Sequence, residues 1–163
     1  MYRTAAVLLG VGLGGLADSI FLEQLLQRYF MVSSVVPPVD VVSLRSNIWW
    51  GGAYQAFCWC VAVAGAIWLY RAARQRMPVP SPRLFFGSAL LGWGVFNLVE
   101  GLLNHEILGI HHVGAGSYAV LGDLLYLVIG GVVPIVVGAL LVRSRHEWMT
   151  RPGRPRGRLT PWG

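Results

Sequence analysis

The sequence predicts an all-α integral membrane protein, a bundle of four transmembrane helices. Of its 163 residues 55% are hydrophobic and only 12% are charged. The mean hydropathy of +0.58 is far above that of a soluble domain, which indicates that the protein folds in a bilayer. Four apolar segments are each long enough for the roughly 20 helical residues that cross about 30 Å of hydrocarbon. Helices also satisfy their own backbone polar groups in lipid.

The four predicted spans are separated by short polar or Pro-containing connections. The first is preceded by Arg3 and contains a small-x-small "GLA" at 15–17. These features would also suit a signal peptide, but a similar segment recurs later in the chain. The second carries no charge at all. The expected spans cover roughly residues 4–30, 48–70, 84–108 and 118–142.

Arginine positions predict the orientation of these spans. The second connection and the segment after the fourth span are rich in Arg, whereas Arg45 is the one basic residue of the first connection and the third has none. The positive-inside rule therefore places both termini in the cytoplasm. Residues 143–163, rich in Pro, Gly and Arg, are expected to form a disordered basic tail that lies against anionic lipid. Nucleic acid is not an expected partner.

An internal repeat is visible when the chain is shifted by 82 residues. Residues 8–30 then lie over residues 90–112 with six identities. Asp18 falls on Glu100, and these are the carboxylates in the middle of the two apolar segments. Glu23 falls on His105, and Tyr29–Phe30 on His111–His112. We therefore expect one membrane domain, residues 1–142, built from two tandem helical hairpins of about 4–70 and 84–142.

Ionisable side chains within the apolar segments predict a polar site. An intramembrane carboxylate costs on the order of 2.5–3.5 kcal/mol on insertion scales, so it needs a partner, a proton, a metal or water. With both termini inside, the polar groups of the first, third and fourth spans lie in the outer half of the bundle. Five of the seven acids belong to these spans: Asp18, Glu23, Glu100, Glu106 and Asp123.

The third span predicts a metal site. If its helix continues past Gly109, then Asn97, Glu100, Asn104 and His111 fall within about 60° of arc. Imidazole with carboxylate in a helical core is suited to Cu, Fe or Zn. The candidate ligands are His105, His111, His112, Glu100, Glu23 and Asp18, and the supporting polar residues are Asn97, Asn104, Gln27, Gln55 and Asp123.

Simpler roles for these residues stay open. His111 and His112 could be interfacial loop residues, and His105 could donate one hydrogen bond to Glu100 or Asp18. Asp18 and Glu100 could form a carboxyl pair that shares a proton. Asp123 could cap or bond a neighbouring helix, with the Tyr126 hydroxyl as one partner.

The chain resembles a family of small bacterial membrane proteins, domain of unknown function 2243, over residues 5–142. The resemblance rests on "GLADSIFLEQLLQ", "GAYQAFCW" and, most clearly, "GWGVFNLVEGLLNHEILGIHHV". The family pattern has a carboxylate followed by Gly, then a His and a His-His pair, in each copy. The second copy here keeps that pattern at Glu100, Gly101, His105, His111 and His112.

The first copy departs from the family pattern. Asp18 stays, but Ser19 replaces Gly, Glu23 replaces His and Tyr29–Phe30 replace the His pair. In the second helix, Gly51 and Gln55 stand where the family has Asp and His. The resemblance thus implies a divergent member that has lost about half of its imidazoles, and it implies architecture more than chemistry.

We interpret the chain as a bacterial inner-membrane protein with a metal site in the outer half of the bundle. A proton or small-ion pathway is one alternative, and a non-catalytic subunit of a larger membrane complex is another. No catalytic motif is present, so an enzyme is the less expected reading. Haem is not expected, because the core histidines come from one short stretch. The expected partners are the lipid bilayer and either a homo-oligomer or a larger membrane complex.

Overall fold

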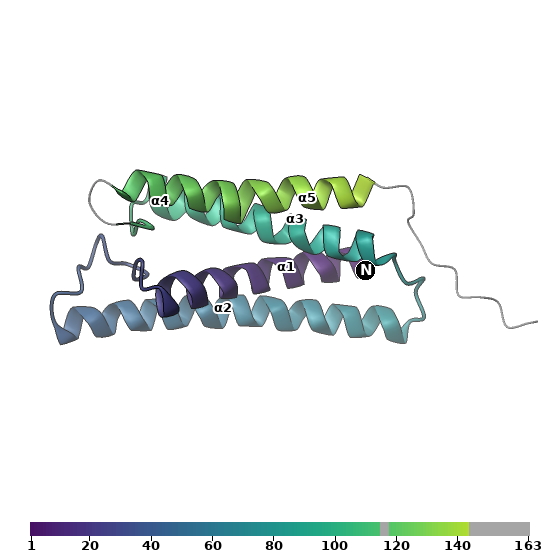
Figure 1. Cartoon of the computed structure of the whole chain (residues 1–163). Coiled ribbons are helices and arrows are strands. Elements are labelled where there is room, and N and C mark those ends of the chain that lie inside the picture. The colour runs from purple at the N-terminus through teal and green to yellow at the C-terminus, as the bar shows by residue number, and fades with distance from the viewer. Residues whose placement is uncertain (115–117, 144–163) are drawn as a thin grey trace, which may run out of the picture.

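The computed structural model describes residues 1–114 and 118–143, and the predicted tail lies outside them from residue 144 onward. Four helical stretches within the described residues are long and apolar enough to cross a membrane. They are Tyr2–Leu25, Val41–Arg74, Pro82–Ile107 and Ala119–Arg143. The predicted number and order of spans are confirmed, and the chain is all-helical over the described residues (Figure 1).

Three of the four stretches change from α-helix to π-helix, which the sequence did not predict. A π-helical segment widens the helix locally and is often found at functional sites. The elements in order are α1 Tyr2–Asp18, η1 Ser19–Leu25, α2 Val41–Arg74, α3 Pro82–Gly101, η2 Leu102–Ile107, α4 Ala119–Leu125, η4 Tyr126–Val132 and α5 Val133–Arg143.

The second stretch begins seven residues before the predicted position because Asp40 caps it. The Asp40 carboxylate accepts a hydrogen bond from the Ser43 backbone N–H at 2.7 Å, and the Ser43 hydroxyl accepts one from the Asp40 N–H at 3.1 Å. This reciprocal capping box satisfies donors that would otherwise be unpaired. At 34 residues, α2 is longer than the hydrocarbon thickness requires.

α1 and α3 form the centre of the molecule (Figure 1). α2 packs against α1, while α5 and η4 pack against α3. The central pair crosses at two glycines: a Cβ on Gly10 would overlap the Ala89 carbonyl oxygen, and one on Gly92 would overlap the Val7 carbonyl oxygen. These small residues therefore bring the two backbones into contact, as close helix packing in lipid requires.

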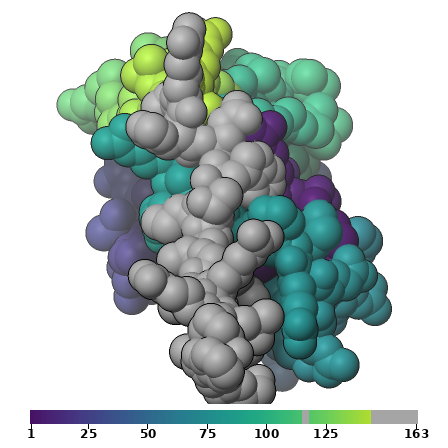
Figure 2. All heavy atoms as spheres, turned by 90° about the vertical axis from the view of Figure 1, so that its right-hand side faces the viewer, coloured from purple at the N-terminus to yellow at the C-terminus, as the bar shows by residue number. Residues whose placement is uncertain are grey.

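The two ends of the molecule differ in composition. The starts of α1 and α3 and the end of α5 meet at one end, which faces the viewer in Figure 2. The last turns of α2 and α5 carry basic residues, which are Arg71 and Arg74 in α2 and Arg143 in α5. The opposite end carries the 26–40 connection and the residues before α4. The intramembrane acids and histidines lie toward that second end.

Candidate metal centre

A tight turn at the end of η2 brings His111 back over the helix. The Leu108 N–H donates to Leu103 O at 2.7 Å and the Ile110 N–H to Asn104 O at 2.9 Å. Between them Gly109 has φ +56°, a left-handed conformation that glycine adopts without steric cost. The helix therefore ends before Gly109, as the predicted span of 84–108 implies, so the condition for the 60° arc is not met and His111 reaches the site from a loop.

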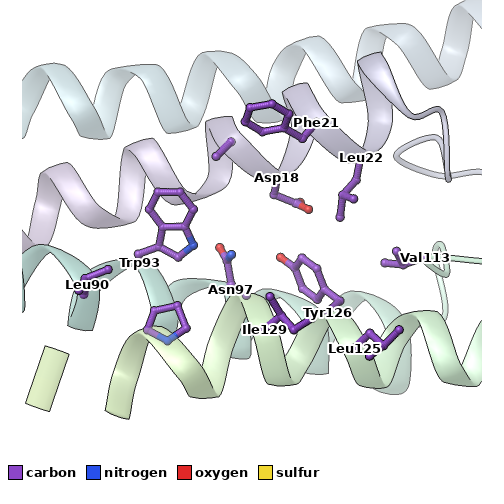
Figure 3. A pocket seen from close by; sticks show the side chains of 13 residues that line it. Asp18, Phe21, Leu22, Leu90, Trp93, Asn97, Val113, Leu125, Tyr126 and Ile129 are labelled. Carbon is purple, nitrogen blue, oxygen red and sulfur yellow. The ribbon is translucent and has the colours of Figure 1, made fainter. Parts of the chain in front are cut away.

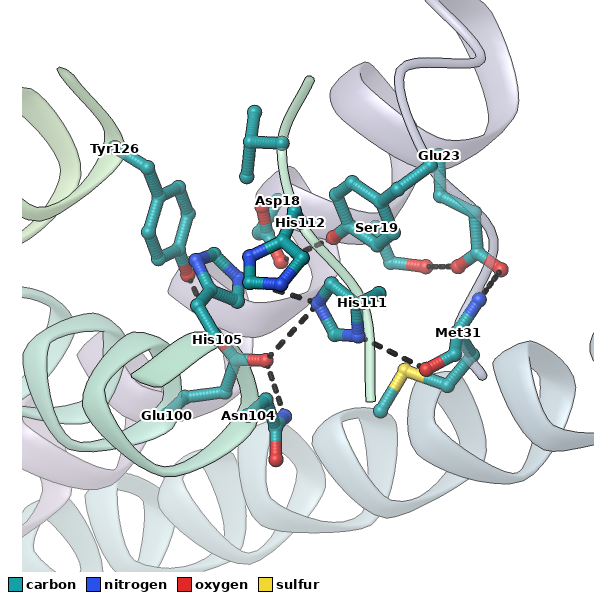
Figure 4. Close-up of polar contacts among 12 residues, drawn as sticks. Asp18, Ser19, Glu23, Met31, Glu100, Asn104, His105, His111, His112 and Tyr126 are labelled. Atoms are coloured by element: carbon teal, nitrogen blue, oxygen red, sulfur yellow. Dashed lines mark hydrogen bonds and ion pairs between the residues drawn. The ribbon is translucent and has the colours of Figure 1, made fainter. Parts of the chain in front are cut away.

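Three buried side chains converge at this turn (Figure 4). Glu100, His105 and His111 each offer a ligand atom, and these atoms all lie within 4.8 Å of one another. His105 Nε2 is 3.2 Å from His111 Nε2, and His111 Nε2 is 3.9 Å from Glu100 Oε1. Their exposed fractions are 7%, 2% and 0% in the same order. This is a water-poor cluster of two imidazoles and one carboxylate.

The other ring nitrogen of each imidazole faces an acceptor. His111 Nδ1 lies 2.9 Å from the Met31 carbonyl oxygen, so this nitrogen must carry the proton. His105 Nδ1 lies 3.1 Å from Asp123 Oδ1, an ion-pair distance that is not aligned as a hydrogen bond. A proton on His105 Nδ1 is still favoured there, because a bare nitrogen lone pair would face a carboxylate oxygen.

These outer contacts direct both Nε2 lone pairs inward. With a proton on each Nδ1, two neutral imidazoles present lone pairs to each other at 3.2 Å, which is unfavourable unless a cation lies between them. Two nitrogen ligands of tetrahedral zinc, each about 2.0–2.1 Å from the ion, are separated by about 3.3 Å. The spacing of the two imidazoles thus matches a shared metal ion, or a proton carried by His105.

Glu100 is held by two further side chains. Asn104 donates to Oε1 at 2.6 Å, and the Tyr126 hydroxyl donates to Oε2 at 2.9 Å. The sequence suggested Asp123 as the partner of Tyr126, and this is wrong: the hydroxyl reaches across to α3. Partners of this kind orient a ligand and tune its basicity.

His111 is in the neutral form that a metal requires. Burial, and next the nearby His105, lower the pKa of the His111 imidazole to about 4. Its ring also stacks on Tyr29, with centroids 4.3 Å apart and an interplanar angle of 11°. At neutral pH the imidazole is therefore unprotonated at Nε2 and fixed in orientation.

The first-half candidates lie beside this cluster with partners of their own. Asp18 Oδ2 accepts a hydrogen bond from the Tyr29 hydroxyl at 2.8 Å. Glu23 accepts one from the Ser19 hydroxyl at 2.8 Å, and Ser19 in turn accepts one from Gln55 at 2.9 Å. Asp18 and Glu23 are both buried, so neither carboxyl group faces lipid.

The remaining candidates have supporting or separate positions. Asp123 accepts hydrogen bonds from the Val113 N–H and from His112 Nδ1, both at 2.7 Å, and so ties the loop to α4. The His112 side chain is 39% exposed, and its ring centroid lies 6.5 Å from that of His105, but its hydrogen bond goes to Asp123. Gln27, with φ +49°, is exposed in the 26–40 connection. Asn97 lines a separate cavity.

Sequence reasoning named Asp123 as a supporting residue but missed two other groups that orient the imidazoles. The Met31 carbonyl has no sequence signature, because any residue supplies a backbone oxygen. Tyr29 was noticed as the counterpart of His111 but not as its stacking partner. The three-residue spacing from Asp123 to Tyr126 placed both on one helix face, which was the available signal.

Comparisons with known proteins identify the family. Residues 5–145 match the family described as "Predicted membrane protein (DUF2243)". No curated protein and no solved structure matches. The resemblance seen in the sequence is thus confirmed, and with four helices suited to a bilayer this is a multi-pass membrane protein. The chain belongs to the DUF2243 family of membrane proteins.

Proposed function

We propose that this protein binds one divalent transition metal ion through His105 Nε2, His111 Nε2 and a Glu100 carboxylate oxygen. The observation that carries the proposal is the pair of inward-facing Nε2 atoms, 3.2 Å apart, whose outer nitrogens face Asp123 and the Met31 carbonyl. Metal-binding histidines usually have their second nitrogen held in this way.

The ligand set limits the choice of metal. Two neutral imidazoles and one carboxylate suit Zn²⁺, Fe²⁺ or Cu²⁺, and in such sites they leave coordination positions open. An ion bound by all three groups must draw the Glu100 carboxylate nearer to the imidazoles than its present 3.9 Å from His111 Nε2. Asn104 and Tyr126 would limit how the carboxylate turns. The role is metal handling in the membrane, since no catalytic motif accompanies the site.

Metal titration tests the proposal. Detergent-purified protein is stripped with a chelator, dialysed and titrated with Zn²⁺, Fe²⁺ under anaerobic conditions, and Cu²⁺, with bound metal measured by elemental analysis. We expect one tight site per chain. His105→Ala, His111→Ala and Glu100→Gln should each weaken it by more than about 100-fold, because each removes one of three ligands.

His112→Ala is the matched control, since this histidine lies outside the three-residue cluster. It should leave the stoichiometry at one ion per chain. Equal loss in His112→Ala and His111→Ala would contradict the assignment, and so would a wild-type protein that takes up none of the three metals on titration. Circular dichroism on every variant separates lost ligands from lost fold.

A proton pathway is the second candidate, and one feature favours it. The exposed His112, Asp123, His105 and His111 form a continuous series of contacts that leads inward toward Glu100. Such series serve as proton relays in membrane proteins. Proton flux in liposomes that Glu100→Gln abolishes, together with no stoichiometric metal, would favour this function over metal binding.

We further propose that the two halves are copies of one hairpin, about 4–70 and 84–142, in a bacterial cytoplasmic membrane. Both termini would lie in the cytoplasm with the metal site in the outer half, as the arginine distribution predicts. The matched glycine contacts of Gly10 and Gly92 support the repeat. Cysteine accessibility labelling at Ser34 and Arg76 would test the orientation. A homo-oligomer or a larger membrane complex is the expected assembly.

A further inference from the structure

A cavity of about 470 Å³ lies on one side of the central helices, and none of the three candidate metal ligands lines it. It is bounded by η1 and α1 on one wall and by α3, α4 and η4 on the other (Figure 3). Phe21, Leu125 and Ile129 line it and are each about half exposed or more. Since all three belong to membrane-spanning stretches, the cavity opens toward lipid rather than toward water.

The inner part of the cavity carries two oxygen atoms that need a partner. Asp18 Oδ1 and Asn97 Oδ1 are buried and have no hydrogen-bond partner among the residues that the structure describes. Both side chains line the cavity and point toward its interior in Figure 3, and both residues are more than nine-tenths buried. An unpaired buried polar group is unfavourable, so a ligand with a hydrogen-bonding group placed to pair with it binds more tightly than one without.

The rest of the lining is apolar and partly aromatic. Trp93 and Tyr126 form broad ring surfaces, and Gly130 leaves the floor beside Asn97 open. Binding sites for small molecules have this composition, with a few polar groups that fix orientation in an apolar pocket of 300–1,000 Å³. No Arg is among the lining residues, which disfavours a phosphate headgroup.

We propose that this cavity binds a membrane-soluble molecule with a hydroxyl-bearing polar end and an apolar body. The hydroxyl inserts toward Asp18 and Asn97, and the body extends between Phe21 and Ile129 into the lipid. A hydroxyl group is suited to this end because it can donate its one hydrogen bond to the Asn97 oxygen while it accepts one from the Asp18 carboxyl group in its protonated form. An acyl chain alone would leave both oxygens unpaired. A phenolic headgroup, as in a quinol, and an aliphatic lipid alcohol share this chemistry.

The cavity adjoins the metal cluster through Tyr126. The ring of this residue lines the cavity, while its hydroxyl donates to Glu100 Oε2 at 2.9 Å. A bound molecule therefore lies against a side chain that orients a candidate metal ligand. The binding proposal does not depend on the metal, and it is tested on both metal-free and zinc-treated protein.

The test measures binding of three probes to the full chain in lipid nanodiscs by equilibrium dialysis. They are a decyl-substituted hydroquinone kept reduced with ascorbate, its dimethyl ether, and 1,2-dioctanoylglycerol. We expect saturable binding of at least one hydroxyl probe and binding of the ether that is about fivefold to tenfold weaker than that of the hydroquinone. Competition between the two hydroxyl probes shows whether the phenol or the aliphatic alcohol is preferred.

Two variants test whether the hydroquinone binds in this cavity. Asn97→Leu removes one of the two partners and should lower hydroquinone affinity toward that of the ether. Gly130→Val projects a side chain toward Asn97 and should abolish saturable binding while zinc uptake is retained. Val95→Leu, a substitution on an exposed position of α3, is the matched control and should change nothing.

Equal affinity for hydroquinone and ether would overturn the proposal, because the two oxygens would then play no part. The proposal would also be overturned if neither the hydroquinone nor the diacylglycerol bound saturably. Both comparisons use the wild-type chain, so they hold even if a variant fails to fold. Since zinc uptake is measured separately, failure here is distinguishable from failure of the metal assignment.

Discussion

The turn that ends η1 and the turn that ends η2 have nearly the same backbone but different side chains. In the first half the Leu26 N–H donates to Phe21 O, and Gln27 has φ +49°. In the second half the Leu108 N–H donates to Leu103 O, and Gly109 has φ +56°. Every one of these positions is separated from its counterpart by 82 residues. The scaffold alone therefore does not decide which half can hold a metal.

Three side-chain differences separate the halves. The positions of His105 and His111 are occupied in the first half by Glu23 and Tyr29, 82 residues earlier. In the second half the Asp123 carboxylate lies beside His105. In the first half Gly51 lies beside Glu23, because a Cβ on Gly51 would overlap Glu23 Oε1. At these two positions the first half thus has a carboxylate and a phenol, whereas the second has two imidazoles, one of them backed by a carboxylate.

The largest expected effect concerns what the halves share, the glycine crossing of α1 and α3. Gly92→Leu places a side chain where the Val7 carbonyl oxygen lies, and backbone cannot yield as a flexible side chain does. We expect a loss of more than about 4 kcal/mol, seen as aggregation or absence of a monodisperse peak in detergent. Gly10→Leu, at the matching position, should be equally damaging.

Gly52→Leu is the control for this pair. Among the described residues no atom lies within 4 Å of a Cβ at Gly52, so the substitution should leave the midpoint of thermal unfolding within a few degrees of wild type. A well-folded Gly92→Leu protein would mean that the two halves do not meet at this crossing.

The next effect is the gain of a second site. In Glu23→His/Tyr29→His/Gly51→Asp, the first half acquires two imidazoles and a backing carboxylate around Asp18, as the second half has around Glu100. We expect the bound metal to rise from one to two ions per chain by elemental analysis. The variant that carries Tyr29→Phe in place of Tyr29→His lacks one ligand and should stay at one. If the triple variant also stays at one, side chains alone do not explain the difference.

The spans could be predicted from the sequence, whereas the route of His111 to the site could not. Apolar length decides that a segment crosses lipid, and it is visible residue by residue. The turn at Gly109 depends on a π-helical segment and on two backbone hydrogen bonds. A helical wheel assumes a regular α-helix and so cannot represent either. The wheel did place Glu100 and His111 together, but by a path that the chain does not take.

Candidate ligands were also easier to predict than their partners. All three members of the cluster were named from residue type and spacing, because His and Glu are rare in apolar segments. Asp18 and Glu23 were named on the same ground, yet hydroxyl groups of Tyr29 and Ser19 contact them instead. Which partner a buried carboxylate finds depends on tertiary packing, and neither the composition nor the period of the sequence records it.

A matched pair of hydroxyl deletions should affect the halves differently. Tyr126→Phe removes a donor from Glu100 and should weaken metal binding about tenfold to 100-fold, since such partners orient metal ligands. Tyr29→Phe removes the donor from Asp18 and should cost about 1–3 kcal/mol of stability with metal affinity unchanged, because the remaining ring keeps its stack on His111. Metal titration and thermal unfolding on both variants measure this. Equal metal affinities in the two would contradict the assignment of Glu100 as a ligand.

The smallest effect compares the starts of α2 and α4, the second helix of each half. Asp40 caps α2 with Ser43, whereas the described residues show no side-chain cap hydrogen bond at the start of α4. Asp40→Ala should therefore lower the thermal midpoint by only a few degrees at pH 7.

The hydrogen bond from the Ser43 backbone N–H, and next that from its hydroxyl, lower the pKa of Asp40, so the ionised form is favoured by folding. This stabilisation is present above the ordinary pKa of an aspartate, about 3.9, and is lost as the pH falls through the lower value of the folded state. Asp40→Asn keeps a capping side chain that does not titrate, so the midpoint of wild type relative to this variant should fall between pH 6 and pH 2.5. A constant difference over that range would mean that the carboxylate does not interact with the helix start in the membrane-bound protein.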